Sequence, residues 1–223
     1  MEKIFKTSTT ELFQFLKDTN DIKSSWINSI PLPNNHYLVP VSYAIINDLT
    51  DIDNFTIWRN KYKEVYPTQF EASRESTIHW LKNVLLPSEN RILFVIKNCA
   101  SQTVGHIGLS ADFNDNSNVL EIDNVVKSPD CETPGLMSIA MSHLISWVMP
   151  ILPVDHIRLK VMRDNQSAVE FYKRNNFKIL TELTLRREVT DQMVSYLFDP
   201  SGSDGSMLLM EHEIAAPCTE DMI

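Results

Sequence analysis

The sequence contains few of the residues that form crosslinks or metal sites. Its three cysteines, Cys99, Cys131 and Cys218, lie far apart and form no C-x-x-C pair, which favours free thiols in a reducing compartment over a disulfide framework. The six histidines include no H-E-x-x-H motif and no cluster with cysteines. We therefore expect no metal site.

Long apolar runs are also missing. No stretch approaches the roughly 18 consecutive apolar residues of a membrane-spanning helix, and the first residues contain no apolar signal-peptide core. There are no internal repeats and no low-complexity tracts. These absences predict a cytoplasmic protein that neither crosses nor binds a membrane.

Positive charge is scarce overall but unevenly distributed. The net charge is -9 and the pI about 5.1, which argues against a nucleic-acid partner. Residues 199–223 contain six acidic residues and no Lys or Arg, whereas residues 156–188 have a local sum of +4. This basic strip, which includes Arg163, Lys173 and Arg174, could hold a phosphorylated cofactor, or its charges could be scattered and solvated.

What remains is a chain of 223 residues, 43% hydrophobic, long enough for one domain with a sizeable core. Hydrophobic periodicity predicts helices over about 10–17, 50–66, 73–86, 136–148 and 166–174. Shorter alternating or apolar runs predict strands near 36–42, 91–98, 102–113, 118–126, 156–162, 179–189, 192–198 and 207–214. Residues 28–35, rich in proline and asparagine, are expected to be a connection. This order predicts an α/β (α+β) fold with helices packed on a mixed sheet.

Two segments carry the signals for chemistry. A strand that ends near Lys127 leads through the loop at 130–135 to a helix, and such a helix N-terminus offers free amides for a pyrophosphate. A second strand is followed by the pattern Asn165-x-x-Ala168-x-x-x-Tyr172-x-x-x-Asn176-Phe177. Asn176 occupies a position that requires a left-handed residue, which asparagine tolerates.

Together these segments resemble the Gcn5-related N-acetyltransferase (GNAT) superfamily. The resemblance spans about residues 38–180 and includes the sequences Trp58-Arg-Asn60, Gly105-His-Ile-Gly-Leu109 and Glu121-Ile-Asp-Asn-Val-Val-Lys-Ser-Pro129. It implies a mostly antiparallel mixed sheet in which the fourth and fifth strands of the family fold splay apart. It also implies a core at 37–180, preceded by a helical addition at 1–36 and followed by a β extension at 181–213 and a flexible acidic tail at 214–223.

The resemblance further implies acyl transfer from acetyl-coenzyme A, or another short-chain acyl-coenzyme A, to an amine. The cofactor contacts it assigns are Val125, Val126, Lys127, Glu132, Thr133, Pro134, Gly135, Leu136, Met137, Asn165 and Tyr172. Tyr172 occupies the position of the general acid for the departing thiolate, and the backbone near Val125 that of the carbonyl donor. The loop departs from the family pattern because Asp130 replaces a basic residue and Thr133 replaces a glycine.

The sequence does not decide which residue is the catalytic base or which amine is the acceptor. Glu121 and Asp123 share one face of their strand, and His106 lies on the preceding strand, so any of the three could accept a proton, directly or through water. Trp58, Glu71, Arg74 and Trp80 are candidate acceptor contacts.

The chain resembles bacterial enzymes that acylate nucleotide-linked amino sugars for surface polysaccharides such as O-antigen, which we favour. The alternatives are a protein N-terminal or polyamine acetyltransferase, or a non-catalytic coenzyme-A-binding module. The strands after residue 181 could pair across a homodimer or cover an edge of their own sheet.

Overall fold

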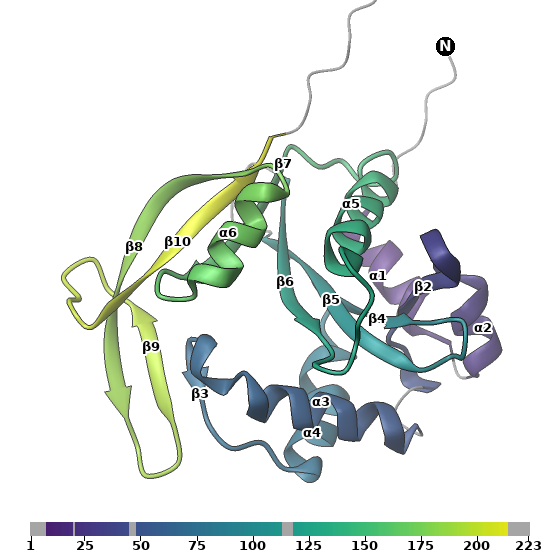
Figure 1. Cartoon of the computed structure of the whole chain (residues 1–223), viewed down its shortest axis with the longest axis horizontal. Coiled ribbons are helices and arrows are strands. Elements are labelled where there is room, and N and C mark those ends of the chain that lie inside the picture. The colour runs from purple at the N-terminus through teal and green to yellow at the C-terminus, as the bar shows by residue number, and fades with distance from the viewer. Residues whose placement is uncertain (1–7, 20, 45–47, 113–117, 214–223) are drawn as a thin grey trace, which may run out of the picture.

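A computed structural model of the chain describes residues 8–19, 21–44, 48–112 and 118–213. Its centre is a ten-stranded sheet in the order β1-β2-β4-β5-β6-β7-β10-β8-β9-β3, with helices on both faces (Figure 1). Only β6 and β7 pair in parallel among the described strands. The structure therefore confirms the mixed, mostly antiparallel sheet.

The strands are β1 (Ile30–Leu32), β2 (His36–Pro40), β3 (Thr68–Gln69), β4 (Arg91–Lys97), β5 (Thr103–Asp112), β6 (Val119–Lys127), β7 (His156–Met162), β8 (Phe177–Val189), β9 (Val194–Phe198) and β10 (Gly205–His212). The helices are α1 (Thr9–Lys17), α2 (Ile22–Ile27), α3 (Leu49–Lys61), α4 (Arg74–Trp80), α5 (Leu136–Val148) and α6 (Gln166–Arg174), and α4 continues into a π-helical turn at Leu81–Leu85.

Two apolar cores lie on opposite faces of the sheet. Helices α1, α5 and α6 cover one face, where Leu136, Ala140 and Leu144 of α5 are completely or almost completely buried. Helices α3 and α4 cover the other face with a smaller core that includes Ile52 and Phe55. The spacing of the α5 residues places them on one side of the helix, which is why the sequence predicts α5 with the correct limits.

Strand β6 contains a bulge, and it diverges from β7 in the same region. His106 of β5 pairs with Val126, and Gly108 pairs with Asp123, so β6 contains one extra residue between the two pairs. Asn124 in this bulge has a positive φ of 48°. Pairing of β6 with β7 stops at Glu121 and Arg158. Because a bulge bends its strand, the two strands diverge beyond this point, which confirms the expected splay.

The N-terminal region differs from the expected helical addition and connection. The segment expected to connect contains β1, which pairs with β2, and α2 precedes it. Pro31 lies inside β1, where it is tolerated because β1 is an edge strand. The described part of residues 1–36 thus contains the short strand β1 besides the helices α1 and α2, where a connection was expected at 28–35.

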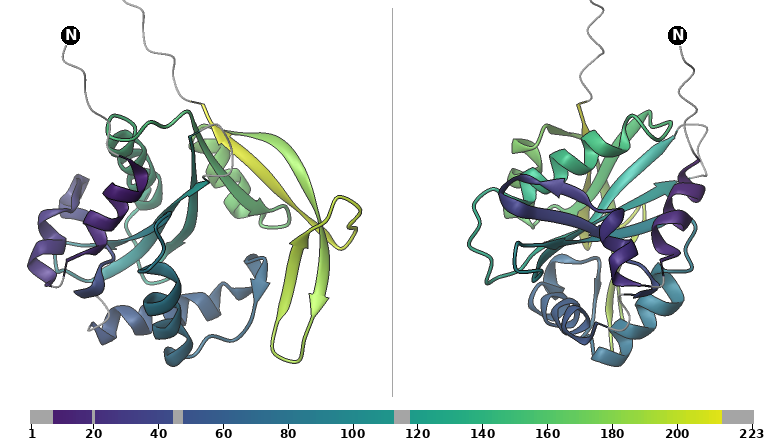
Figure 2. Two further views of the ribbon diagram at one scale, coloured as in Figure 1. Left: turned by 180° about the vertical axis from the view of Figure 1, so that it is seen from behind. Right: turned by 90° about the vertical axis from the view of Figure 1, so that its right-hand side faces the viewer.

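The C-terminal strands belong to the same sheet as the core. β8 runs without interruption across the expected boundary at residue 180, and β10 lies between β7 and β8. The β8–β9 hairpin extends to β3, as the left view in Figure 2 shows, and Tyr196 N donates to Pro67 O at 2.7 Å. The hairpin thus pairs within its own chain. The expected tail at 214–223 lies outside the described residues.

Among the described helices, none combines the length and the hydropathy that a membrane crossing requires.

Candidate active site

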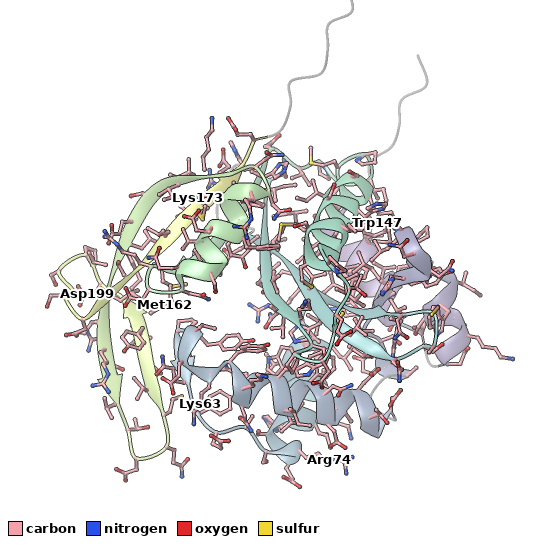
Figure 3. The ribbon with its side chains drawn as sticks, in the orientation of Figure 1. Lys63, Arg74, Trp147, Met162, Lys173 and Asp199 are labelled. Atoms are coloured by element: carbon pink, nitrogen blue, oxygen red, sulfur yellow. The ribbon has the colours of Figure 1, made fainter. Side chains whose placement is uncertain are left out.

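The divergence of β6 and β7 opens a cavity of about 900 Å³, which we call the main groove. Its walls are β6, the end of β7, the inner face of α6, residues 62–67 and side chains of β8, β9 and β10. In Figure 3, Met162 marks the end of β7 on one side of this opening, and Lys63 marks the segment after α3 on the other. The residues that line the groove thus come from segments between residues 62 and 207, which meet where β6 and β7 diverge.

The edge of β6 that β7 leaves unpaired lines this groove. Val125, Val126 and Lys127, to which the resemblance assigns cofactor contacts, are all in its wall. Beyond Glu121, β6 has no registered partner on β7. Polar backbone groups on this edge can therefore pair with a ligand that runs alongside β6.

The N-terminus of α5 offers backbone donors rather than basic side chains. Gly135 caps the helix with a left-handed φ of 67°, and nothing lies within 4 Å of the position where a Cβ would be. No hydrogen bond inside the described part of the chain uses the amides of Glu132, Thr133, Gly135, Leu136 or Met137. Such amides at a helix start can bind an anion.

The side chains of this loop lie in different places. Leu136 is buried in the core, and Met137 lines the main groove. Pro134 is exposed, and Glu132 and Thr133 line a separate polar cavity of about 570 Å³. Only Met137 among them therefore adds a side chain to the main groove.

The basic strip does not converge on this loop. Arg163 pairs with Glu182, and Lys173 pairs with Glu170 at 2.9 Å. Neither basic residue lines the main groove. Scattered surface ion pairs therefore describe these residues better than a phosphate site does.

Helix α6 contributes two of the predicted residues. Asn165 caps α6 by accepting from the Ala168 amide at 3.3 Å, and it also lines the main groove. Tyr172 is buried against Phe171 and Phe177 in edge-to-face contacts. Burial raises the pKa of Tyr172 above its usual value, and its hydroxyl has no hydrogen-bond partner among the described residues. It is therefore protonated near neutral pH and able to donate.

The two carboxylates on β6 differ in their partners. Glu121 forms an ion pair with Lys160 at 2.5 Å. Asp123 is partly buried, with its side chain 19% exposed; its Oδ1 has no hydrogen-bond partner among the described residues, and Arg91 lies 3.7 Å from its Oδ2. Burial raises the pKa of Asp123 to about 6, although Arg91 acts in the opposite direction. Asp123 is therefore the carboxylate without a close ion pair, and its unpartnered oxygen is itself buried beside Gly108.

His106 is a poorer candidate for the base. Its Nδ1 lies 2.6 Å from the Asn124 carbonyl oxygen, to which it donates in the neutral tautomer. Burial lowers the pKa of His106 to about 4, so the ring is neutral and weakly basic at neutral pH. It packs against Phe55 and Trp58, with ring centroids 5.3 and 5.9 Å away. His106 supports the bulge through Asn124.

A second cavity of about 350 Å³, which we call the side chamber, adjoins the main groove. Its lining includes Phe55, Arg59, Tyr66, Phe70, Trp80 and Arg91. Tyr66, Pro67 and Asn124 line both cavities. The side chamber therefore opens beside Asp123 from the α3–α4 face of the sheet.

Only one of the four expected acceptor contacts lies in the side chamber. Trp80 lines it, whereas Trp58 is 3% exposed and lines neither cavity, because it packs against His106. Glu71 pairs with Lys63 at 2.8 Å, and Arg74 pairs with Asp53 at 3.0 Å, both outside the two cavities. Trp58, Glu71 and Arg74 therefore do not line either of the two cavities.

The sequence reasoning missed Arg59, Tyr66 and Arg91. Arg59 follows Phe55 by four positions, so both lie on the same side of α3, and a charged residue there was a usable signal. Tyr66 lies in an irregular segment without periodicity, and Arg91 lies at the start of β4. Within the described residues, no group of three or more His, Cys, Asp or Glu could hold a metal ion.

Comparisons with known proteins agree with this geometry. The sequence model of the acetyltransferase (GNAT) family matches residues 53–177. No curated protein matches the chain.

Several solved structures share the fold at low sequence identity. A ribosomal L7/L12 α-N-acetyltransferase in complex with coenzyme A has a TM-score of 0.60 and 14% identity, covering 85% of this chain and 100% of the other. An acetyltransferase from Salmonella typhimurium that modifies the N-terminal serine of L7/L12 has a TM-score of 0.61 and 14% identity, with coverage of 84% and 99%. The spermidine N-acetyltransferase of Vibrio cholerae, solved with coenzyme A and spermine, has a TM-score of 0.55 and 14% identity. This match covers 79% of this chain and 94% of the other.

At these identities the structural likenesses show the fold alone. The family match spans more than half of the sequence and includes the bulged strand, the helix start at Gly135 and Tyr172. The chain therefore belongs to the acetyltransferase (GNAT) family.

Proposed function

We propose that this protein transfers an acetyl or short acyl group from acyl-coenzyme A to a primary amine, with Asp123 as base and Tyr172 as acid. The observation that carries the proposal is a partly buried carboxylate with an unpartnered oxygen in the same groove as a protonated, unpartnered tyrosine. The two groups have environments that keep one ready to accept a proton and the other ready to donate one.

The residues of the main groove fit acyl-coenzyme A. The unpaired edge of β6 at residues 125–127 can pair with the amides of the pantetheine arm, and the free amides from Glu132 to Met137 can bind the pyrophosphate. A groove of about 900 Å³ is large enough for such a ligand. When bound, the cofactor supplies a thioester that an amine can attack.

Each catalytic residue then has one task. The Asp123 carboxylate accepts a proton from the acceptor's ammonium or from the attacking amine, directly or through water, because desolvation keeps this carboxyl basic enough to do so near neutral pH. The backbone N–H near Val125 donates to the carbonyl oxygen as negative charge develops there. The Tyr172 hydroxyl donates its proton to the leaving sulfur.

For the acceptor, we keep the nucleotide-linked amino sugar as the favoured class. Phe70 and Trp80 give the side chamber aromatic faces on which a sugar or a base can stack. A protein N-terminus or a polyamine is the alternative, because proteins of similar fold act on L7/L12 and spermidine. A non-catalytic coenzyme-A-binding module is the remaining alternative.

Thiol release tests the proposal directly. The purified chain is incubated with acetyl-coenzyme A and, in separate reactions, a nucleotide-linked amino sugar, spermidine or a peptide with a free N-terminus. We expect thiol release with at least one amine and the acetylated amine in the mass spectrum. Binding of coenzyme A without thiol release for any amine would refute the enzymatic proposal and favour the binding module.

A further inference from the structure

Arg59 is a half-buried cation without an anionic partner. Its guanidinium carbon lies 3.8 Å from the centre of the Tyr66 ring and 4.8 Å from that of Phe70. Its Nη2 donates to the Thr68 carbonyl at 2.5 Å. No carboxylate among the described residues forms an ion pair with it.

The second terminal nitrogen of Arg59 is the unusual atom. Nη1 is buried and has no hydrogen-bond partner among the described residues, and burial lowers the pKa of Arg59. A buried donor without a partner is costly, and more so when it carries charge. The rings of Tyr66 and Phe70 hold the guanidinium in place. The unpartnered Nη1 therefore points to a ligand that accepts a hydrogen bond from it.

The surroundings of Arg59 favour an anion. Arg59 and Arg91 are the charged residues in the lining of the side chamber, and no Asp or Glu is found in the lining given by the described residues. Arg91 lies beside Asp123, which leaves Arg59 as the uncompensated charge. A planar guanidinium binds carboxylates and phosphates through two parallel hydrogen bonds.

Arg59 lies close enough to the proposed base for one acceptor molecule to reach both. The side chamber meets the main groove at Tyr66 and Asn124, and Asn124 directly follows Asp123. Tyr66 also stacks on Arg59. An acceptor with its amine at Asp123 can therefore extend past Tyr66 to the guanidinium.

We infer that the acceptor is an amine that also carries a carboxylate or a phosphate, and that Arg59 binds this anionic group in the side chamber. The inference rests on the proposed function. It makes polyamines poor acceptors, because a second ammonium would be placed against Arg59 in a chamber without carboxylates. Arg59 thus determines specificity for the acceptor.

Matched pairs of amines test the inference. Phenylalanine and phenylalaninamide differ in one carboxylate, and glucosamine 1-phosphate and glucosamine differ in one phosphate. We expect kcat/KM with acetyl-coenzyme A to be at least about tenfold higher for the anionic member of one pair, which also identifies whether the anion is a carboxylate or a phosphate. Equal rates within both pairs, or a preference for spermidine over all four amines, would overturn the inference.

Two variants connect the preference to Arg59. Arg59→Met keeps an unbranched apolar side chain at this position and removes a half-buried charge, so it should fold. It should raise KM for the preferred anionic amine by about 10- to 100-fold and leave KM for acetyl-coenzyme A unchanged. Arg59→Lys should restore only part of the affinity. Arg186→Met, which removes an exposed arginine paired with Glu188 and Asp199, is the matched control and should behave as the wild type.

Acceptor binding without a donor separates this inference from the proposed function. Calorimetric titration with the preferred amine should show binding that Arg59→Met weakens by the same factor as KM. Arg59-dependent binding without any acyl transfer would refute the proposed function and support the inference. Transfer that Arg59→Met leaves unchanged would support the proposed function and refute the inference.

Discussion

The ionisation of Asp123 should oppose folding, and Asp123→Asn should reveal by how much. Burial raises the pKa of this carboxyl from 3.8 to about 6 in the folded protein. Between these values the folded state holds a proton that the unfolded state has released. The stability of the wild type therefore falls as pH rises through this window and becomes constant well above pH 6.

The size of the effect follows from the two pKa values. A shift of about two units corresponds to about 3 kcal/mol of lost stability when both states are fully ionised. About 1.4 kcal/mol of this develops between pH 5 and pH 8, where the protein can be studied. Asparagine does not titrate, so the free energy of unfolding of Asp123→Asn minus that of the wild type should increase by this amount over the same interval.

Urea unfolding of both proteins at pH 5 and pH 8 measures this double difference. Any fixed gain or loss from the asparagine amide cancels between the two pH values. Glu170→Gln is an exposed control: Lys173 lowers the pKa of the Glu170 carboxyl, so this variant should show no such increase. If the difference for Asp123→Asn were the same at both pH values, Asp123 would not be desolvated and our reasoning for the base would fail.

Three further predictions concern catalysis, and all are measured by thiol release with the preferred amine. Tyr172→Phe should lower kcat by about 10²- to 10⁴-fold, as expected for loss of an acid, while KM for acetyl-coenzyme A changes less than about threefold; equal effects on both would show that Tyr172 only packs. Wild-type kcat/KM should decrease below about pH 6, because protonated Asp123 cannot accept a proton; a profile that is flat down to pH 5 would contradict this role. In Gly108→Ala the new Cβ would overlap Asp123 Oδ1, so kcat should fall at least about tenfold, whereas Gly205→Ala, whose Cβ would make only ordinary contacts with Tyr196, should retain the wild-type rate.

Periodicity predicted the elements that have enough length to display it. The limits of α5 and α6 agree with the sequence analysis because each begins at a recognisable capping residue, Gly135 or Asn165, and ends where its apolar spacing ends. β1 and β3 were missed because strands of three and two residues are too short to show alternation. β1 is held by pairing with β2, which follows it in the sequence, and β3 by pairing with β9, which is distant from it in the sequence.

The candidate site residues that the sequence could name are those that lie together in one continuous motif. Tyr172, Asn165 and the loop at Gly135 come from continuous segments. Arg59 becomes significant only because Tyr66 and Phe70, from an irregular segment, lie against it. The choice between Glu121 and Asp123 likewise depended on Lys160, a residue of β7 that reaches one carboxylate and leaves the other free.

The pairing of β3 with β9 also sets an order of assembly. Thr68 and Ser195 are partners across 127 positions of sequence, so the contact cannot form until residue 195 has left the ribosome. Contacts between distant residues form late, because closing a long loop costs entropy before any bond compensates for it. A nascent chain that has reached residue 174 already contains β6, α5 and α6, but the segment that carries Tyr66 still has no β9 to hold it. The segments proposed to bind the cofactor thus precede residue 175, whereas the segment with Tyr66, proposed to bind the acceptor, is completed only after residue 195 has been added.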